Sequence, residues 1–294
     1  MAKTKRITSQ RLNGSKIMWS LLTRYRSTWR YMYVTADYQR DWIKNKERTV
    51  AEILQEFPRL LDSNMIEEDY RLAYPLSTDS LYNRWSAMVD PIIEYGTRMC
   101  PLWKETLELP QDMTLDKLTK DQKSILALII VPVVFEGNSK KRAAGRSTIK
   151  DVVGFFIDRY WDIINMPQYL KEVDPKTHPQ PFVLSLSSAI HLESRNAFII
   201  IEKQAIPQPS ILKAVDVCYK AHYILDCEYQ GAWTFFEKCV YQSQCFAERR
   251  MGLPCTQKCS LNTAADVQCT QHVFSCIFKA TRRVWISSRC FNLF

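Results

Sequence analysis

The pattern of apolar and polar positions predicts helices throughout the first hundred residues. From residue 18 onward, apolar side chains recur three, four, seven and eleven positions along, which is the spacing of one helical face. This face consists of Met18, Leu21, Leu22, Tyr25 and Trp29. A second, short helix is expected over about Ala36 to Lys46. Residues 1–14 show no apolar period, so we expect a disordered basic tail there.

Residues 49–105 contain start and stop signals for further helices. The sequence TVAE at 49–52 has the spacing of a capping box, in which the first and last residues each satisfy a free N–H at the helix start. Pro58 then ends this helix. Asn64 is expected to cap a helix that extends to about residue 73. A later helix shows one apolar face, formed by Leu81, Trp85 and Met88. Within it, Asp90-Pro91 predicts a restart or a kink.

The middle of the chain mixes helical signals with loops. Residues 106–121 are polar and are expected to link two regions. Asp121 is expected to cap the apolar segment Ile125 to Val131, and this cap favours a helix where periodicity alone also fits a strand. Gly137 to Arg146 reads as a basic loop, and Thr148 to Tyr160 has a helical pattern.

Two strands are predicted after residue 180. Phe182 to Leu186 alternates, with Phe182, Leu184 and Leu186 on one side, and Phe198 to Ile201 is apolar on both sides. The loop between them is too short for a helical crossover, so an antiparallel pair is expected. Two helices follow, a long one and then Trp233 to Tyr241. The face of the long helix is formed by Ile211, Val215, Cys218, His222 and Leu225.

These elements predict an α+β fold that is predominantly helical, in which a helical N-terminal region precedes a small antiparallel β-pair packed with helices. The expected divisions are a basic disordered tail (1–14), a helical region (15–105), a linker (106–121), an α+β domain (122–244) and a Cys-rich basic tail, expected to be disordered (245–294). Six of the ten cysteines lie in that last segment.

Composition excludes several classes of protein. Hydrophobic residues make up 46% of the 294, so most of the chain should fold, and only 7 glycines leave few glycine-lined phosphate loops. No apolar run approaches the roughly 20 residues that span a bilayer. The basic N-terminus lacks the apolar stretch of a signal peptide. We therefore expect a cytoplasmic or nuclear protein whose cysteines are thiols.

The net charge of +9 is concentrated at the two ends. Residues 1–48 hold 12 basic and 3 acidic residues, and residues 245–294 hold 7 and 2. Basic ends either bind an anionic partner or keep the chain soluble. The candidate nucleic-acid-binding residues are Arg24, Arg26, Arg30, Trp19 and Trp29, because arginines neutralise phosphates and aromatic rings stack on bases. The alternatives are core packing of the rings and an interfacial helix.

Several segments resemble a family found in fish. They are TVAEILQEFPRLLD, YPLSTDSLYNRW, HPQPFVLSLSSA and the longest, AFIIIEKQAIPQPSILKAVDVCYKAHYILDCEYQGAWTFFEKCVY. The family is the sterile alpha motif domain-containing protein three-like family, and the resemblance covers roughly residues 18–242. The sterile alpha motif itself is not evident in this chain, and the Cys-rich tail does not resemble the family. The resemblance implies no activity, cofactor or catalytic residue.

No constellation of residues predicts chemistry. The phosphate-loop pattern fails because Lys140 stands where its first glycine is needed. The tail residues Cys255, Cys259, Cys269, His272 and Cys276 have partial zinc spacing in an order that fits no zinc module, so no metal site is predicted. Cys218 and His222 lie one turn apart but share the stripe of the long helix, which favours core packing. The acidic residues 67–69, and Asp158 with Asp162, read as solvated faces.

The functional prediction is therefore a non-enzymatic interaction or regulatory protein with an unknown protein partner, no cofactor and no catalytic residue. The alternative is a nucleic-acid-binding protein that uses the basic aromatic N-terminal region. A third hypothesis, an enzyme of unfamiliar type, would need a deep polar pocket around residues 178–230.

Overall fold

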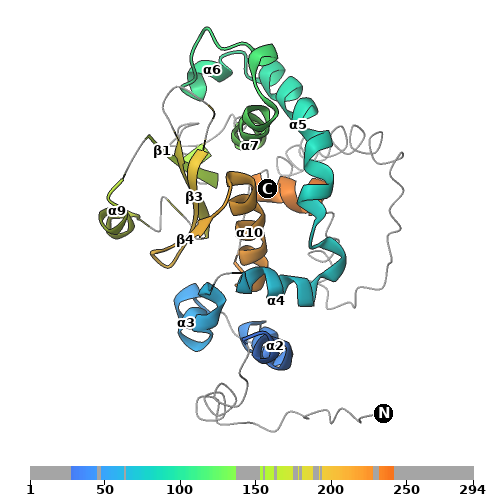
Figure 1. Ribbon diagram of the computed structural model, residues 1–294, viewed down its shortest axis with the longest axis vertical. Helices are drawn as coiled ribbons and strands as arrows, with labels where there is room; N and C mark the ends of the chain where they lie inside the picture. Colours follow the sequence, from blue (N-terminus) through green and yellow to red (C-terminus); the bar gives the residue numbers. More distant parts are fainter. Residues whose placement is uncertain are drawn as a thin grey trace, which may run out of the picture.

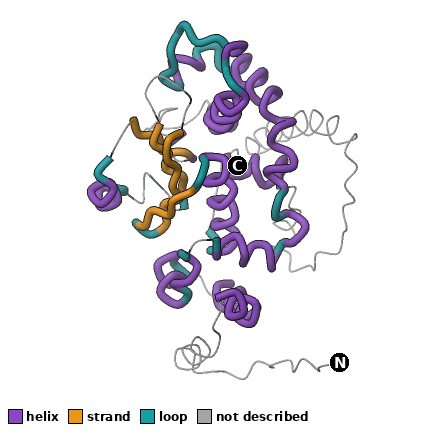
Figure 2. Tube along the Cα trace, viewed as in Figure 1, coloured by secondary structure: helices purple, strands orange, loops and turns teal. Residues whose placement is uncertain are grey.

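The fold is α+β and predominantly helical, as the sequence predicts. The computed structural model describes residues 28–44, 48–62, 64–136, 153–154, 156–161, 164–174, 178, 181–187, 192, 194–227 and 232–241. Helices from the first half of the chain precede a four-stranded mixed sheet, and further helices follow it (Figures 1 and 2). Of the helices in these ranges, none combines the length and apolar character needed to cross a bilayer.

Helix α2 (Thr28–Lys44) begins eight residues before the predicted Ala36. No proline or glycine interrupts this stretch, so the helix starts earlier than predicted. The helix predicted from Met18 lies almost entirely outside the described residues. Helix α3 (Val50–Glu56) confirms the capping box, because Thr49 and Glu52 exchange hydrogen bonds at its start, and it ends before Pro58. The short 3-10 turn η1 (Pro58–Leu61) follows.

Helix α4 (Met65–Ala73) has the predicted bounds, but its predicted cap is wrong. Asn64 lies in the left-handed region with φ 66° and its side chain makes no capping hydrogen bond. Asparagine tolerates this backbone conformation better than most residues, which explains its position. The turn η2 (Pro75–Ser77) comes next.

Helix α5 (Ser80–Met99) runs through Pro91 without restarting, and its predicted apolar face is buried. It packs against α7 (Lys120–Glu136). Helix α7 includes the apolar segment after residue 124, so the prediction that this segment is helical is confirmed. The cap of α7 differs from the prediction. Thr119 and Gln122 form the capping pair, since Gln122 N donates to Thr119 Oγ1 at 3.2 Å and Thr119 N donates to Gln122 Oε1 at 2.9 Å. Asp121 lies inside the first turn.

The predicted linker contains ordered turns. Helix α6 (Trp103–Thr106) and the turn η3 (Leu115–Lys117) lie here, and Leu107 and Leu109 are buried. The main hydrophobic core includes residues from both sides of this segment, from Ile43 to Tyr241. The domain boundaries themselves stay a prediction.

The sheet has the order β1-β2-β3-β4. Strands β2 (Phe182–Ser187) and β3 (Ser194–Ile201) form the predicted antiparallel pair. Two strands were missed. Strand β1 (Ile157–Trp161) pairs parallel to β2, so the helix predicted over Thr148 to Tyr160 is wrong from Ile157 onward. Pairing with a distant strand outweighs the local helical pattern there. Strand β4 (Gln204–Gln208) is an edge strand with Pro207 in it.

Both faces of the sheet are covered by helices. Phe182 and Leu184 pack with Tyr169 of α9 (Met166–Glu172). On the other face, Val183 and Ile199 belong to the main core, together with α10 (Ile211–Ile224). Figure 1 shows α9 and α10 on opposite sides of the sheet. The chain then forms α11 (Ala232–Phe235) and the π-helical turn η4 (Phe236–Tyr241), where the last aromatic helix was predicted.

Candidate functional site

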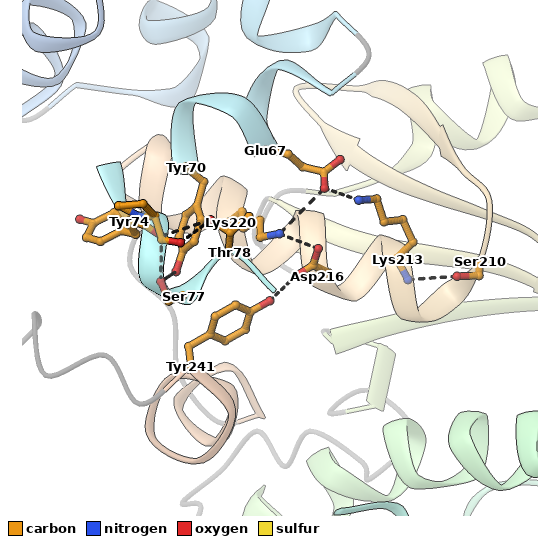
Figure 3. A network of polar contacts seen from close by, with 11 residues as sticks. Glu67, Tyr70, Tyr74, Ser77, Thr78, Ser210, Lys213, Asp216, Lys220 and Tyr241 are labelled. Carbon is orange, nitrogen blue, oxygen red and sulfur yellow. Dashed lines mark hydrogen bonds and ion pairs between the residues drawn. The ribbon is translucent and has the colours of Figure 1, made fainter. Parts of the chain in front are cut away.

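A network of charged and polar side chains joins α4, α10 and η4 inside the protein (Figure 3). Lys220 lies at its centre and is only 1% exposed. Its Nζ is 2.7 Å from Asp216 Oδ2 and 3.9 Å from Glu67 Oε1. Asp216 and Lys220 are four residues apart on α10 and share one face of the helix, from which Lys220 reaches Glu67 of α4.

Two further groups close the network. Lys213 Nζ donates to Glu67 Oε1, and Tyr241 Oη donates to Asp216 Oδ1 at 2.5 Å. Burial raises the pKa of Asp216, while the neighbouring Lys220 ammonium and the Tyr241 hydrogen bond lower it. Two ammonium groups therefore face two carboxylates, and the charges balance inside the protein.

Aromatic rings surround this network. The Tyr70 ring centroid lies 5.7 Å from Lys220 Nζ, and the Tyr219 ring stacks on Tyr241 with centroids 3.8 Å apart. Burial and the adjacent Asp216 carboxyl raise the pKa of Tyr241 well above its usual value, so its hydroxyl remains a donor. The hydrogen bonds and ion pairs of the network join its members to one another and so link α4, α10 and η4.

A second polar cluster lies on the face of the sheet that α9 covers. Asp158 Oδ2 accepts a hydrogen bond from Tyr169 Oη at 2.7 Å and lies 3.2 Å from His178 Nε2. The solvated face predicted for Asp158 and Asp162 is wrong at Asp158, whose side chain is only 14% exposed, and Asp162 lies outside the described residues. Both contacts converge on one carboxylate oxygen, and this arrangement orients Asp158 rather than freeing it as a base.

The core interpretation of Cys218 and His222 is supported by their burial. Burial raises the pKa of the Cys218 thiol well above its ordinary value and lowers the pKa of His222 to about 3. The thiol and the imidazole are therefore both neutral near pH 7, whereas a reactive pair needs a thiolate. The His222 ring packs beside Trp233, with centroids 5.0 Å apart.

The other predicted site residues are not brought together by the described part of the chain. Trp19, Arg24 and Arg26 lie outside it, and only the backbone of Trp29 and Arg30 is described, in the first turn of α2. The tail cysteines and the basic loop at 137–146 also lie outside it. Among the described residues, no three or more His, Cys, Asp or Glu side chains are grouped as a metal site would need.

The outward face of α2 is a feature that the sequence reading missed. Tyr33 is 74% exposed, Val34 and Tyr38 are each 43% exposed, and the acidic Asp37 and Asp41 lie between them. At 100° per residue these five side chains occupy an arc of about 140°. We call them the α2 outer face. The buried residues of the helix, Ala36, Gln39 and Ile43 among them, occupy the opposite side.

Comparisons with known proteins give no match: no protein-family model, no curated protein and no solved structure aligns significantly with this chain. The resemblance to the fish family thus stays a prediction from the sequence segments.

Proposed function

We propose that this chain is a non-enzymatic interaction or regulatory protein that binds a partner protein through the α2 outer face. The observation that carries the proposal is the exposure of Tyr33 and its apolar neighbours on a helix whose other side is buried. Large rings left in water on one helical face are typical of a surface that a partner covers. The resemblance to a family named for an interaction module is an association that agrees with it.

The charges of this face specify the kind of partner. Asp37 is 99% exposed at its side chain, although Arg40 Nη2 contacts it at 2.9 Å, and Asp41 is also exposed. Their carboxylates lie between apolar side chains, so the complementary surface is a basic amphipathic helix. Its apolar residues would cover Tyr33 and Val34, and its lysines or arginines would meet the two aspartates.

The buried network supports a non-enzymatic role. Lys220, Asp216 and Tyr241 are each hydrogen-bonded to another member of the network. A catalytic residue has to reach a substrate, and these side chains are almost fully buried.

Crosslinking followed by affinity measurement tests the proposal. A photoreactive residue placed at Tyr33 in the full chain should crosslink in cells to one reproducible protein. That protein, once purified, should bind the Tyr33→Ser/Val34→Ser variant at least tenfold more weakly. Leu76→Ser is the matched control, because Leu76 is 87% exposed on a different element. Crosslinks that form only within the chain, or equal binding by both variants, would overturn the proposal.

Nucleic-acid binding through Trp19, Arg24, Arg26, Trp29 and Arg30 is the alternative outcome. Phosphate contacts release counterions, so such binding must weaken steeply as salt rises. The same purified chain should therefore be titrated with duplex and single-stranded DNA and RNA between 50 and 200 mM salt, which are about the limits of that effect. A steep slope that disappears when the three arginines become glutamines would replace the protein-docking proposal.

A further inference from the structure

Asp69, in the middle of α4, has a carboxyl group with no solvent exposure and too few hydrogen-bond donors, so the solvated face predicted for residues 67–69 is wrong at this position. Gln39 of α2 donates from Nε2 to Oδ2 at 2.6 Å. The other oxygen, Oδ1, is buried and has no hydrogen-bond partner within the described part of the chain. An ionised carboxylate accepts several hydrogen bonds, so this site suits the neutral acid better than the anion.

Arg40, the next residue on α2, has a buried donor that lacks an acceptor. Its Nη2 donates to Asp37 at 2.9 Å, whereas its Nη1 is buried without an acceptor among the described residues. The Arg40 charge and the Gln39 hydrogen bond both lower the pKa of Asp69, but desolvation is larger and raises it to about 6. Ionisation of Asp69 is therefore coupled to how α2 lies on α4.

The other charged side chains around α4 have partners of their own. They come from α10, from η1 and from α4 itself, and η2 contributes none. The pairs are Lys213–Glu67, Lys220–Glu67, Lys220–Asp216, Arg59–Asp62 and Arg71–Glu68. On α2, Asp37, Asp41 and Lys44 are exposed. The groups that act on Asp69 are thus Gln39 and Arg40, both from α2.

We propose that the contact between Gln39 and Asp69 is a proton-operated latch that holds α2 on α4. With Asp69 protonated, the buried carboxyl is neutral and one donor is enough. When it ionises, the anion needs water or a second donor, and it gains them as α2 opens. Since α2 carries the proposed docking face, the latch would set how firmly that face is presented. The latch does not depend on the existence of a partner.

The direction of the pH effect follows from the pKa. The folded value, about 6, lies above the ordinary 3.8, so the stabilisation is complete below pH 3.8 and is lost as the pH rises through 6. Between pH 5 and pH 7.5, the equilibrium constant for opening α2 should rise about tenfold.

Hydrogen exchange of α2 peptides in the full chain measures this opening. The unchanged protein, Asp69→Asn and the control Asp41→Asn are compared at each pH, which cancels intrinsic exchange and the titration of other groups. We expect the equilibrium constant for opening α2 to rise about tenfold between pH 5 and pH 7.5 in the unchanged protein and in Asp41→Asn. In Asp69→Asn this constant should not change with pH. Identical pH profiles for the unchanged protein and Asp69→Asn would overturn the latch.

A second variant keeps the test valid if Asp69→Asn fails to fold. Arg40→Gln removes the cation that lowers the pKa of Asp69, so the midpoint of α2 opening should move to higher pH. An unmoved midpoint would contradict the latch. Neither result bears on docking, because no partner is present in the experiment.

Discussion

The close approach of α5 and α7 at Gly96 gives the sharpest prediction about stability. A Cβ added to Gly96 would overlap Cγ2 of Ile130. Carbon atoms pack at about 3.5–4.0 Å, so the Ile130 side chain or one of the two helices would have to move. Ile130 is 1% exposed, and its β-branched side chain has one strongly preferred rotamer in a helix. Gly96→Ala therefore overpacks the core.

The expected cost is a balance of two effects. Overpacking a core costs about 1–3 kcal/mol, and the depth of this overlap places Gly96→Ala near the upper end. Alanine is more favourable than glycine inside a helix by about 1 kcal/mol. The free energy of unfolding should consequently fall by about 1–2 kcal/mol, measured by urea denaturation of the full chain.

A second substitution, at Ile130, tests whether the overlap between positions 96 and 130 causes this loss of stability. Ile130→Leu removes the Cγ2 branch at nearly constant volume and should cost less than about 1.5 kcal/mol alone. In the double variant the overlap is absent, so the two changes should couple favourably by at least about 1 kcal/mol. Gly154→Ala is the matched control, because its added Cβ meets no atom within 4 Å. Additive effects at Gly96 and Ile130, or equal costs at Gly96 and Gly154, would refute the close contact.

Three further predictions follow from contacts described above. Lys220→Met should lower the free energy of unfolding by about 3–5 kcal/mol, because it leaves the buried Asp216 carboxylate uncompensated. Lys213→Met, at the partly exposed edge of the same network, should cost less than Lys220→Met in the same urea titration, because Lys213 is 25% exposed and Lys220 only 1%. His222→Phe should reduce acid sensitivity: the folded pKa, about 3, lies below the ordinary 6.5, so stability is full above pH 6.5 and is lost as the pH falls toward 3. Thermal unfolding across pH should show this loss, about 3 kcal/mol at pH 4, in the unchanged protein only. Thr119→Ala should destabilise α7 by about 1 kcal/mol, read from local hydrogen exchange, whereas Asp121→Ala should have a smaller effect.

Elements with strong local signals could be predicted from the sequence. The capping box at Thr49 and the apolar period of α10 placed two helices, and alternation placed β2. Thr119 with Gln122 has the same capping spacing, but the predicted cap of α7 was the acidic Asp121 between them. In these cases the residues that decide the structure are neighbours in the chain.

The missed features depend on distant parts of the chain. Strand β1 is fixed by pairing with β2, more than 20 residues later, and Lys213 meets Glu67 across a separation of 146 residues. The latch at Asp69 has the same origin, because its depth and its partner Gln39 exist only after α2 has packed on α4. Spacing within a segment cannot encode such contacts.

The burial of helix α10 affects how sequence conservation in relatives of this chain should be interpreted. Twelve of its fourteen residues are buried, so almost every position in it is constrained by its neighbours. Evolution would then preserve Asp216, Lys220 and His222 as strictly as it preserves the aliphatic positions around them. An alignment would display these three as an invariant acid, amine and imidazole on a single helix, which is the usual signature of an active site. Burial alone would account for such invariance, so invariance at these three positions could not by itself identify an active site.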